Sequence, residues 1–403
     1  MSILNKDIIL VLSLALSIWG IFQQKDIFAL PDKYFNKYHW IWISIFLGVV
    51  ISMFNAEFFW GQSVSITIIT QRSLYAFILL PAIIHIQPSI QDIQKAIKIL
   101  SYITFSVWII SIISPNMIAS ISEETITNRN SNNANTDIGY YVTGIHIVAL
   151  YTYLLIQKYI QHFSYKHFLK ALFWIGFIIL YQNRSMMIGV ILIFIYSLTK
   201  LKSKYRPIII GSICIVVLIF ISHTWNIWIA LIDETQNQLV DKDYNRWKAL
   251  YYYLYDYSPN WWCYLFGNGM PSGGNSALGN LYWLNMSNGI FSSDLGMIGT
   301  WVHFGIIPLI GIYYVLIQIL AKNKFPLFLK FISFHIIVVP TIFAYNSLPG
   351  ILLFTIIIYL YIHYSELPQY KRRYHQIKQY VSYHYRKLQK RTEDDRLCKT
   401  RTE

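Results

Sequence analysis

Long apolar runs separated by short polar segments recur along most of this 403-residue chain. Met297–Leu320 is one such run, and Pro207–Ser222 is a slightly shorter one. The hydrocarbon core of a bilayer is about 30 Å thick, and about 20 apolar residues cross it as an α-helix. The alternation of apolar and polar residues that marks membrane β-strands is absent from the sequence. The pattern therefore predicts an all-α polytopic membrane protein.

Eleven apolar runs are candidates for transmembrane helices, within a range of ten to twelve. The first has neither a strongly basic start nor a small-residue cleavage site, so we expect a retained span rather than a signal peptide. The candidate spans are residues 8–22, 40–55, 64–86, 96–113, 138–156, 168–182, 186–199, 207–222, 296–320, 327–345 and 349–364.

One connection between spans is much longer than the others. It covers residues 224–293, and we call it the long segment. Its seventy residues far exceed the roughly 2–8 residues that usually join helices, and such loops are usually functional or disordered. We expect short helices in it, because it is rich in tryptophan and tyrosine. The predicted parts are residues 1–223 with helices 1–8, the long segment, residues 294–365 with helices 9–11, and a tail at 366–403.

Basic residues gather in alternate connections and in the tail. These segments hold 26 of the 33 Lys and Arg residues; they are residues 23–39, 87–98, 157–170, 200–206, 321–330 and 366–403. The positive-inside rule places them, and therefore the C-terminus, in the cytoplasm, and it places the long segment on the opposite side. With eleven spans, the N-terminus is expected on the same side as the long segment.

The composition also favours a membrane protein and argues against a nucleic-acid partner. Hydrophobic residues make up 55% of the chain and charged residues 13%, whereas soluble domains carry about 25% charged residues. The net charge is +14, but the tail alone contributes +6. Aromatic and aliphatic residues from Tyr370 to Leu388 recur at helical spacing among the basic ones. This pattern suits a helix on an anionic membrane surface, and equally a solvated tail that fixes the topology.

Motifs for metals, nucleotides and disulfides are missing from the sequence. It contains no Walker loop, no HExxH and no paired CxxC, so we expect no cofactor. The three cysteines fall in a span, in the long segment and in the tail, so a disulfide framework is not expected.

The residues around Arg246 are the first candidates for chemistry. Asp243–Tyr257 predicts a short amphipathic helix with Ala249, Leu250, Tyr253 and Tyr257 on one side. Arg246 could pair with two phosphate oxygens at once, or form a salt bridge with a carboxylate such as that of Asp243. The neighbouring Trp247, like the other tryptophans of the long segment, suits stacking on a sugar ring, and it also suits the membrane interface.

Two further arginines lie within or beside predicted spans. Arg72 falls about eight residues inside its span, and buried charge in a membrane usually faces an interior cavity. Arg184 lies in a tight turn between spans and could instead extend its side chain to lipid headgroups. Arg184, Arg129 and Arg246, with few lysines on the side of the long segment, indicate an anionic ligand there.

The end of the long segment carries an acid and a histidine. Asp294 lies where the chain re-enters the membrane, and an acid there could accept a proton from a sugar hydroxyl or orient it. The sequence Ser292–Asp294 is also a good helix cap, so capping is a second role for this residue. His303 lies about two turns deeper, where a histidine often bonds to a neighbouring helix.

Five features in order resemble the bacterial O-antigen polymerase and O-antigen ligase superfamily. Asn183–Ser185 is similar to that family's Ser-Arg-Ser turn, and the long segment carries an arginine helix. Phe266–Gly269 is similar to its Gly-x-Gly, and Asp294–Gly296 to its Asp-x-Gly. His303–Ile307 is similar to its aromatic-Gly-Ile ending. The resemblance covers residues 180–320; the first 170 residues agree with the family only in hydropathy.

The resemblance implies a lipid-linked oligosaccharide transferase at the outer face of the bacterial inner membrane. A sugar hydroxyl would attack the anomeric carbon of a glycan on polyprenyl pyrophosphate, and the lipid pyrophosphate would leave. Arg246 and Arg184 would hold the pyrophosphate, with Arg72 as a third candidate on grounds of burial. Asp294 would contact or deprotonate the acceptor hydroxyl. The remaining expected substrate-binding residues are Trp247, Gly267, Gly269 and His303.

The sequence departs from the ligase branch at the re-entry point. Ligases typically carry a His-Asn pair there, whereas this chain has Ser-Ser-Asp at 292–294. The departure favours a polymerase that builds O-antigen, capsule or exopolysaccharide, with a flippase and a chain-length regulator as implied partners. A ligase and a non-enzymatic flippase or permease remain the alternatives, although the long segment argues against a flippase.

Overall fold

A computed structural model describes most of the helical part of the chain. The described ranges are residues 32–86, 88–113, 144–162, 164–181, 184–199, 245–273, 276–340 and 350–365, with a few isolated positions between them. All regular elements in these ranges are helical, and no strand occurs in them. The prediction of an all-α chain is therefore confirmed for this part. Arg129 and the tail after residue 365 lie outside the described residues, as do nearly all of the spans 8–22 and 207–222.

The helices keep one numbering along the chain, and η marks a 3-10 or π-helical turn. They are α2 (Asp32–Trp60), α3 (Val64–Thr70), η1 (Arg72–Ile78), α4 (Leu79–Ile86), α5 (Ile90–Ile113), α8 (Ile145–Gln161), α9 (Tyr165–Leu180), α10 (Arg184–Thr199), α13 (Asn245–Tyr251), η2 (Tyr252–Asp256), α14 (Trp261–Phe266), α15 (Ala277–Ser287), η3 (Ser292–Leu295), α16 (Met297–Phe304), α17 (Ile306–Ala321) and α18 (Leu327–Val338). A further apolar helix covers Gly350–Ser365. The chain forms two compact units, residues 1–359 and residues 360–403.

Several helices are suited to a bilayer by length and composition. Trp40–Trp60 in α2 and Ile90–Ile110 in α5 are each long and apolar enough to cross it. Val64–Thr70 and Arg72–Ile84 pass the same test only together, and they are bent by 67° at the break between them. Shorter apolar helices are Met186–Thr199, Ile306–Ala321, Leu327–Val338 and Gly350–Ser365. The chain thus has the helices of a membrane protein, while the count of eleven spans stays a prediction.

Two spans predicted as continuous helices are broken. The span 64–86 is interrupted at Gln71, where α3 ends and η1 begins. The span 296–320 is interrupted at Gly305, whose φ of 78° is left-handed and ends α16. Hydropathy does not register the break at Gly305, because Phe304 and Ile306 beside it are apolar, whereas the break at Gln71 falls among the polar residues 70–73. In a bilayer, such a break is tolerated only where protein or a water-filled cavity surrounds the freed backbone groups.

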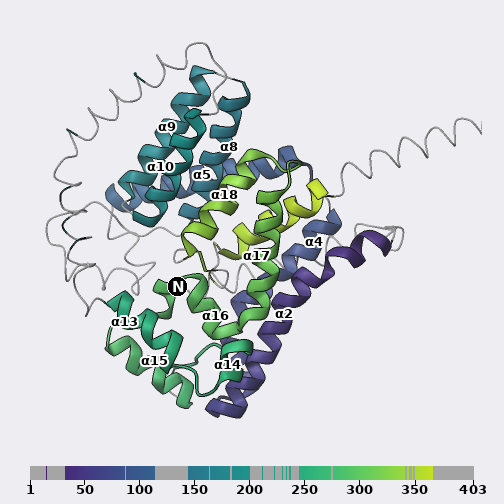
Figure 1. Cartoon of the computed structure of the whole chain (residues 1–403), viewed down its shortest axis with the longest axis vertical. Helices are drawn as coiled ribbons and strands as arrows, with labels where there is room; N and C mark the ends of the chain where they lie inside the picture. The colour runs from purple at the N-terminus through teal and green to yellow at the C-terminus, as the bar shows by residue number, and fades with distance from the viewer. Residues whose placement is uncertain are drawn as a thin grey trace, which may run out of the picture. The chain divides into compact units, whose positions relative to one another are not determined.

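One group of helices is organised around α8. It packs against α5, α9, α10 and α18, as Figure 1 shows. The contacts are largely aromatic: the Trp174 ring of α9 lies 5.1 Å from the Tyr102 ring of α5 and 5.4 Å from the Tyr151 ring of α8. A polar contact lies among them, because the Tyr153 hydroxyl is 2.6 Å from Nδ1 of His335.

A second group is organised around α2 and α17. These two helices approach closely because small residues line their contact. A Cβ atom on Gly48 would overlap Pro308, and one on Gly311 would overlap the Ser44 hydroxyl. Three short helices also contact α2: α14 and α15 of the long segment, and α16, which follows it (Figure 1). The helix α17 contacts α18 of the first group.

Candidate functional site

Two glycine-containing sequences of the resemblance meet in the structure. Because α16 ends at Gly305, the carbonyls of its last turn lack partners within the helix. The turn at 267–269 supplies them: the amide of Asn268 donates to the Val302 carbonyl at 3.0 Å, and the amide of Gly269 donates to the His303 carbonyl at 2.9 Å. The long segment therefore caps the broken end of α16.

Glycine is required where the backbones of these segments touch. Gly267 has a φ of 84°, and a Cβ atom there would overlap the His303 carbonyl oxygen. Gly305 faces it in the same way, since its Cβ atom would overlap the Leu265 carbonyl oxygen. At Gly269, with a φ of 80°, a Cβ atom would lie 2.7 Å from the Ala56 side chain of α2. The geometry gives these glycines a structural reason; their predicted contacts with substrate stay predictions.

Buried amide side chains hold the opposite side of the same turn. The amide of Asn55 in α2 donates to the Gly267 carbonyl at 2.8 Å. The Asn268 oxygen accepts from the Trp60 indole at 3.0 Å, and its nitrogen donates to Ser258 and Val302. Buried amides of this kind must be hydrogen-bonded, so they fix the turn against α2.

Gln62 extends this contact to the next part of the long segment. Its nitrogen donates to the Met270 carbonyl at 2.8 Å, and its oxygen accepts from the Ser272 amide at 2.8 Å and the Ser276 hydroxyl at 3.0 Å. Sequence reasoning did not single out Asn55, Gln62 or Asn268. One feature of the sequence could have identified them: each is an uncharged amide at or near the end of an apolar run.

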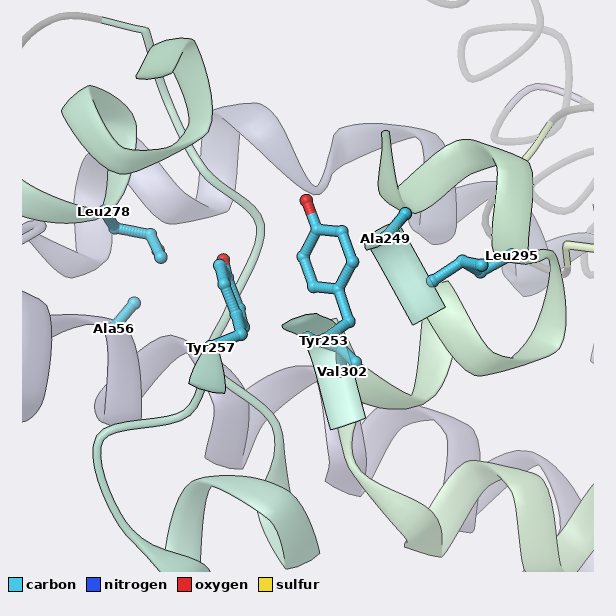
Figure 2. Packing of buried hydrophobic residues seen from close by; sticks show 7 residues of the cluster. All are labelled: Ala56, Ala249, Tyr253, Tyr257, Leu278, Leu295 and Val302. Carbon is cyan, nitrogen blue, oxygen red and sulfur yellow. The ribbon is translucent and has the colours of Figure 1, made fainter. Parts of the chain in front are cut away.

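A hydrophobic cluster holds the arginine helix, which is formed by α13 and η2, in place. Its buried members are Ala56, Ala249, Tyr253, Tyr257, Leu278, Leu295 and Val302, which come from α2, α13, η2, α15, η3, α16 and the residue after η2 (Figure 2). Ala249, Tyr253 and Tyr257 are the predicted apolar side of the arginine helix, and Leu250 is partly buried against the cluster. Burial raises the pKa of the Tyr253 phenol to about 12 and the pKa of Tyr257 well above its ordinary value.

Arg246 and Trp247 lie on the exposed side of α13. Both side chains are exposed, whereas Ala249 is buried in the cluster beneath them. The guanidinium is therefore accessible to an anion from outside the protein core. In addition, α13 contacts η3, the turn whose backbone contains Asp294. The fold thus brings the elements that carry the two predicted catalytic residues next to each other.

Asp294 does not occupy the N-cap of the re-entering helix. That position in α16 belongs to Gly296, whose φ is 54°, and Asp294 lies in the separate 3-10 turn η3. The N-cap position considered for Asp294 is therefore occupied by a glycine, which makes no side-chain cap.

His303 is buried, and both of its ring nitrogens have protein partners. Nδ1 lies 3.1 Å from the Gly269 carbonyl oxygen, and Nε2 lies 3.0 Å from the Ser292 hydroxyl. The ring thus connects α16 to the 267–269 turn and to η3, as expected for a histidine that bonds to neighbouring elements.

The other two predicted arginines lie on different elements. Arg72 is half-buried at the start of η1, directly after the helix break, and η1 contacts α3 and α4. Arg184 is the first residue of α10, which packs against α8, α9 and α18. The structure therefore joins Arg246 and Asp294 through neighbouring elements, and it places the backbone of Arg184 in the other helix group.

Within the described ranges, no group of three or more His, Cys, Asp or Glu side chains is arranged to hold a metal ion. Comparison of the chain with protein-family models, with curated proteins and with solved structures finds no match.

Proposed function

We propose that this protein is a glycosyltransferase that joins oligosaccharide units carried on polyprenyl pyrophosphate. The units would be polymerised into O-antigen, capsular or exopolysaccharide chains at the outer face of a bacterial inner membrane. The proposal starts from the ordered resemblance across residues 180–320. It gains support from the contact between α13 and η3, which brings the Arg246 helix beside the Asp294 turn.

The proposed reaction is a displacement at the anomeric carbon. The acceptor hydroxyl attacks this carbon, a new glycosidic C–O bond forms, and the bond to the pyrophosphate oxygen breaks. The lipid pyrophosphate leaves with the bonding electrons, and the hydroxyl proton passes to the Asp294 carboxylate. The exposed Arg246 guanidinium would offset the charge that develops on the leaving pyrophosphate. Trp247, exposed beside it, offers a flat apolar face for a sugar ring.

The test uses the purified protein in lipid vesicles with purified lipid-pyrophosphate repeat units and no nucleotide. Longer glycans on the lipid support the polymerase. Units that cross the bilayer without lengthening indicate a flippase and contradict the proposal. Transfer to an added lipid A core, in place of chain growth, indicates a ligase.

Arg246 gives the sharpest test of the site. Replacing it with Ala or Lys is expected to lower chain growth by about 100-fold or more, because a preorganised, two-pronged contact to the pyrophosphate is lost. Lys248→Ala is the matched control, since Lys248 is an exposed cation on the same helix. Normal chain lengths from Arg246→Ala, in protein of normal abundance, would remove Arg246 from the proposed mechanism.

A further inference from the structure

For a neutral ring, the hydrogen bonds of His303 have only one consistent arrangement. A carbonyl oxygen can only accept, so Nδ1 carries the hydrogen that is donated to the Gly269 carbonyl, 3.1 Å away. With a neutral ring, Nε2 is then an acceptor, and the Ser292 hydroxyl donates to it at 3.0 Å. The imidazole thus connects the two segments: it donates to the 267–269 turn and accepts from η3.

The turn η3, which begins at Ser292, contacts both α13 of the arginine helix and α16. The Ser292 backbone lies directly against α16, because a Cβ atom on Gly299 would overlap its carbonyl oxygen. Figure 2 shows Tyr253 in the cluster between Ala249 and Tyr257. The arginine helix and α16 therefore meet at η3, and Ser292 makes the contact of this turn with α16.

We infer that His303 is a positioning residue. Its hydrogen bond to Ser292 orients η3, the turn that contains Asp294. This inference rests on the proposed function for its kinetic consequences. Its structural part is independent, because the bond holds η3 whether or not the protein transfers sugars. A shift of about 1 Å in a reacting group can cost about 100-fold in rate, so the orientation of this turn matters to catalysis.

Two substitutions of His303 separate its two hydrogen bonds. In His303→Asn, the shorter amide can still donate to the Gly269 carbonyl from the position of Nδ1, but it cannot reach Ser292. In His303→Gln, the longer amide places an acceptor near the position of Nε2, so the contact with Ser292 is kept. Ser292→Ala removes the same contact from the other side.

The expected kinetic pattern follows from this design. His303→Asn and Ser292→Ala each lower kcat for chain growth by about tenfold or more, with KM for the lipid-linked unit changed less than about twofold. The double variant is no slower than Ser292→Ala, because both changes remove one shared bond. His303→Gln retains most of the wild-type kcat. Additive losses in the double variant, or equal losses for Asn and Gln, would overturn the inference.

A spin label provides a readout that does not need activity. Ser293 is exposed on η3, so Ser293→Cys can be labelled in a protein whose native cysteines are serine. The label is expected to become more mobile in the Asn and Ala variants and to stay immobile with Gln. An unchanged label in all variants contradicts positioning by His303. A mobilised label in a protein that never lengthens glycans supports positioning and contradicts the proposed function instead.

Discussion

Gly269 and His303 are joined by a reciprocal pair of hydrogen bonds. The Gly269 amide donates to the His303 carbonyl at 2.9 Å, and the His303 ring donates to the Gly269 carbonyl over 3.1 Å. The two residues are 34 positions apart in the sequence. The pair fixes the turn of the long segment on the broken end of α16.

Gly267 and Gly305 are expected to be intolerant of any side chain. Gly267→Ala and Gly305→Ala should each reduce stability by about 2–4 kcal/mol, from the left-handed φ together with the overlap of facing backbones. Thermal unfolding in detergent, together with protein abundance in membranes, measures the effect.

Gly61→Ala is the matched control for these substitutions. Gly61 has a φ of 63°, but a Cβ atom there would meet nothing within 4 Å. It should therefore show only the cost of the left-handed backbone, about 1–2 kcal/mol. Equal losses of stability in Gly61→Ala and Gly267→Ala would show that the close contact between the 267–269 turn and the end of α16 contributes nothing to stability.

Cys263 is expected to react slowly with maleimides in the folded protein. The thiol is fully buried in α14, and burial raises its pKa from 9.0 to about 11. At pH 8 this leaves about 100-fold less thiolate than an ordinary cysteine has, and thiolate is the reacting form. The measurement is labelling of a variant with Cys214 and Cys398 replaced by serine, before and after denaturation. The exposed Ser293→Cys, in a cysteine-free background, should label rapidly; fast labelling of native Cys263 would contradict its burial.

Alkaline pH is expected to destabilise the packing of the arginine helix through Tyr253. Burial disfavours the ionised phenol and raises its pKa from 10.0 to about 12, so the folded state holds the proton more tightly than the unfolded state. This contribution is fully present below pH 10 and is lost as the pH rises toward 12. Its upper limit is roughly 2–3 kcal/mol.

The measurement is thermal unfolding between pH 8 and pH 11.5 for wild type and Tyr253→Phe. The variant should lose less stability over this interval than the wild type. Tyr255→Phe is the control, because Tyr255 is exposed and its substitution should leave the pH dependence unchanged. Identical pH dependence in all three proteins would contradict a buried, protonated Tyr253.

Trp261 and Trp262 are expected to contact lipid at the membrane interface. They begin α14 with 65% and 43% of their surfaces exposed, and α14 packs against the apolar helices α2 and α17. Tryptophan is enriched at this depth of a bilayer. Brominated lipids should quench the fluorescence of the wild type more than that of the Trp261→Phe/Trp262→Phe variant. Trp174→Phe is the control, because Trp174 is buried between helices and should contribute little to the quenching.

Periodicity and hydropathy predicted the local features of this fold. The spacing of Ala249, Leu250, Tyr253 and Tyr257 identified the buried side of the arginine helix, because i, i+4 positions share one side of a helix whatever surrounds it. Long apolar runs likewise identified α2 and α5. Helical periodicity and the length of an apolar run are properties of one segment, so the sequence of that segment is enough to predict them.

The breaks and the polar contacts depend on residues distant in the sequence. His303, Gly305 and Pro308 are local signals of a helix end, but hydropathy treats the whole run as one span. The break itself is stabilised by the distant amides of Asn268 and Gly269. The roles of Asn55 and Gln62 are hidden for the same reason, since their partners lie over 200 residues away. The predicted pairing of the Arg246 and Asp294 elements was accessible only through the resemblance, which preserves the order of motifs along the chain.

The long segment is not a module. Three members of its hydrophobic cluster, Ala56, Leu295 and Val302, lie outside it. Its backbone also accepts hydrogen bonds from Asn55 at Gly267 and from Gln62 at Met270. A water-soluble fragment cut at residues 224 and 293 would leave these surfaces bare. Grafting the segment onto a related scaffold would require transferring the facing residues of α2 and α16 with it. Evolution of this region is expected to proceed by coordinated change across three distant stretches of sequence.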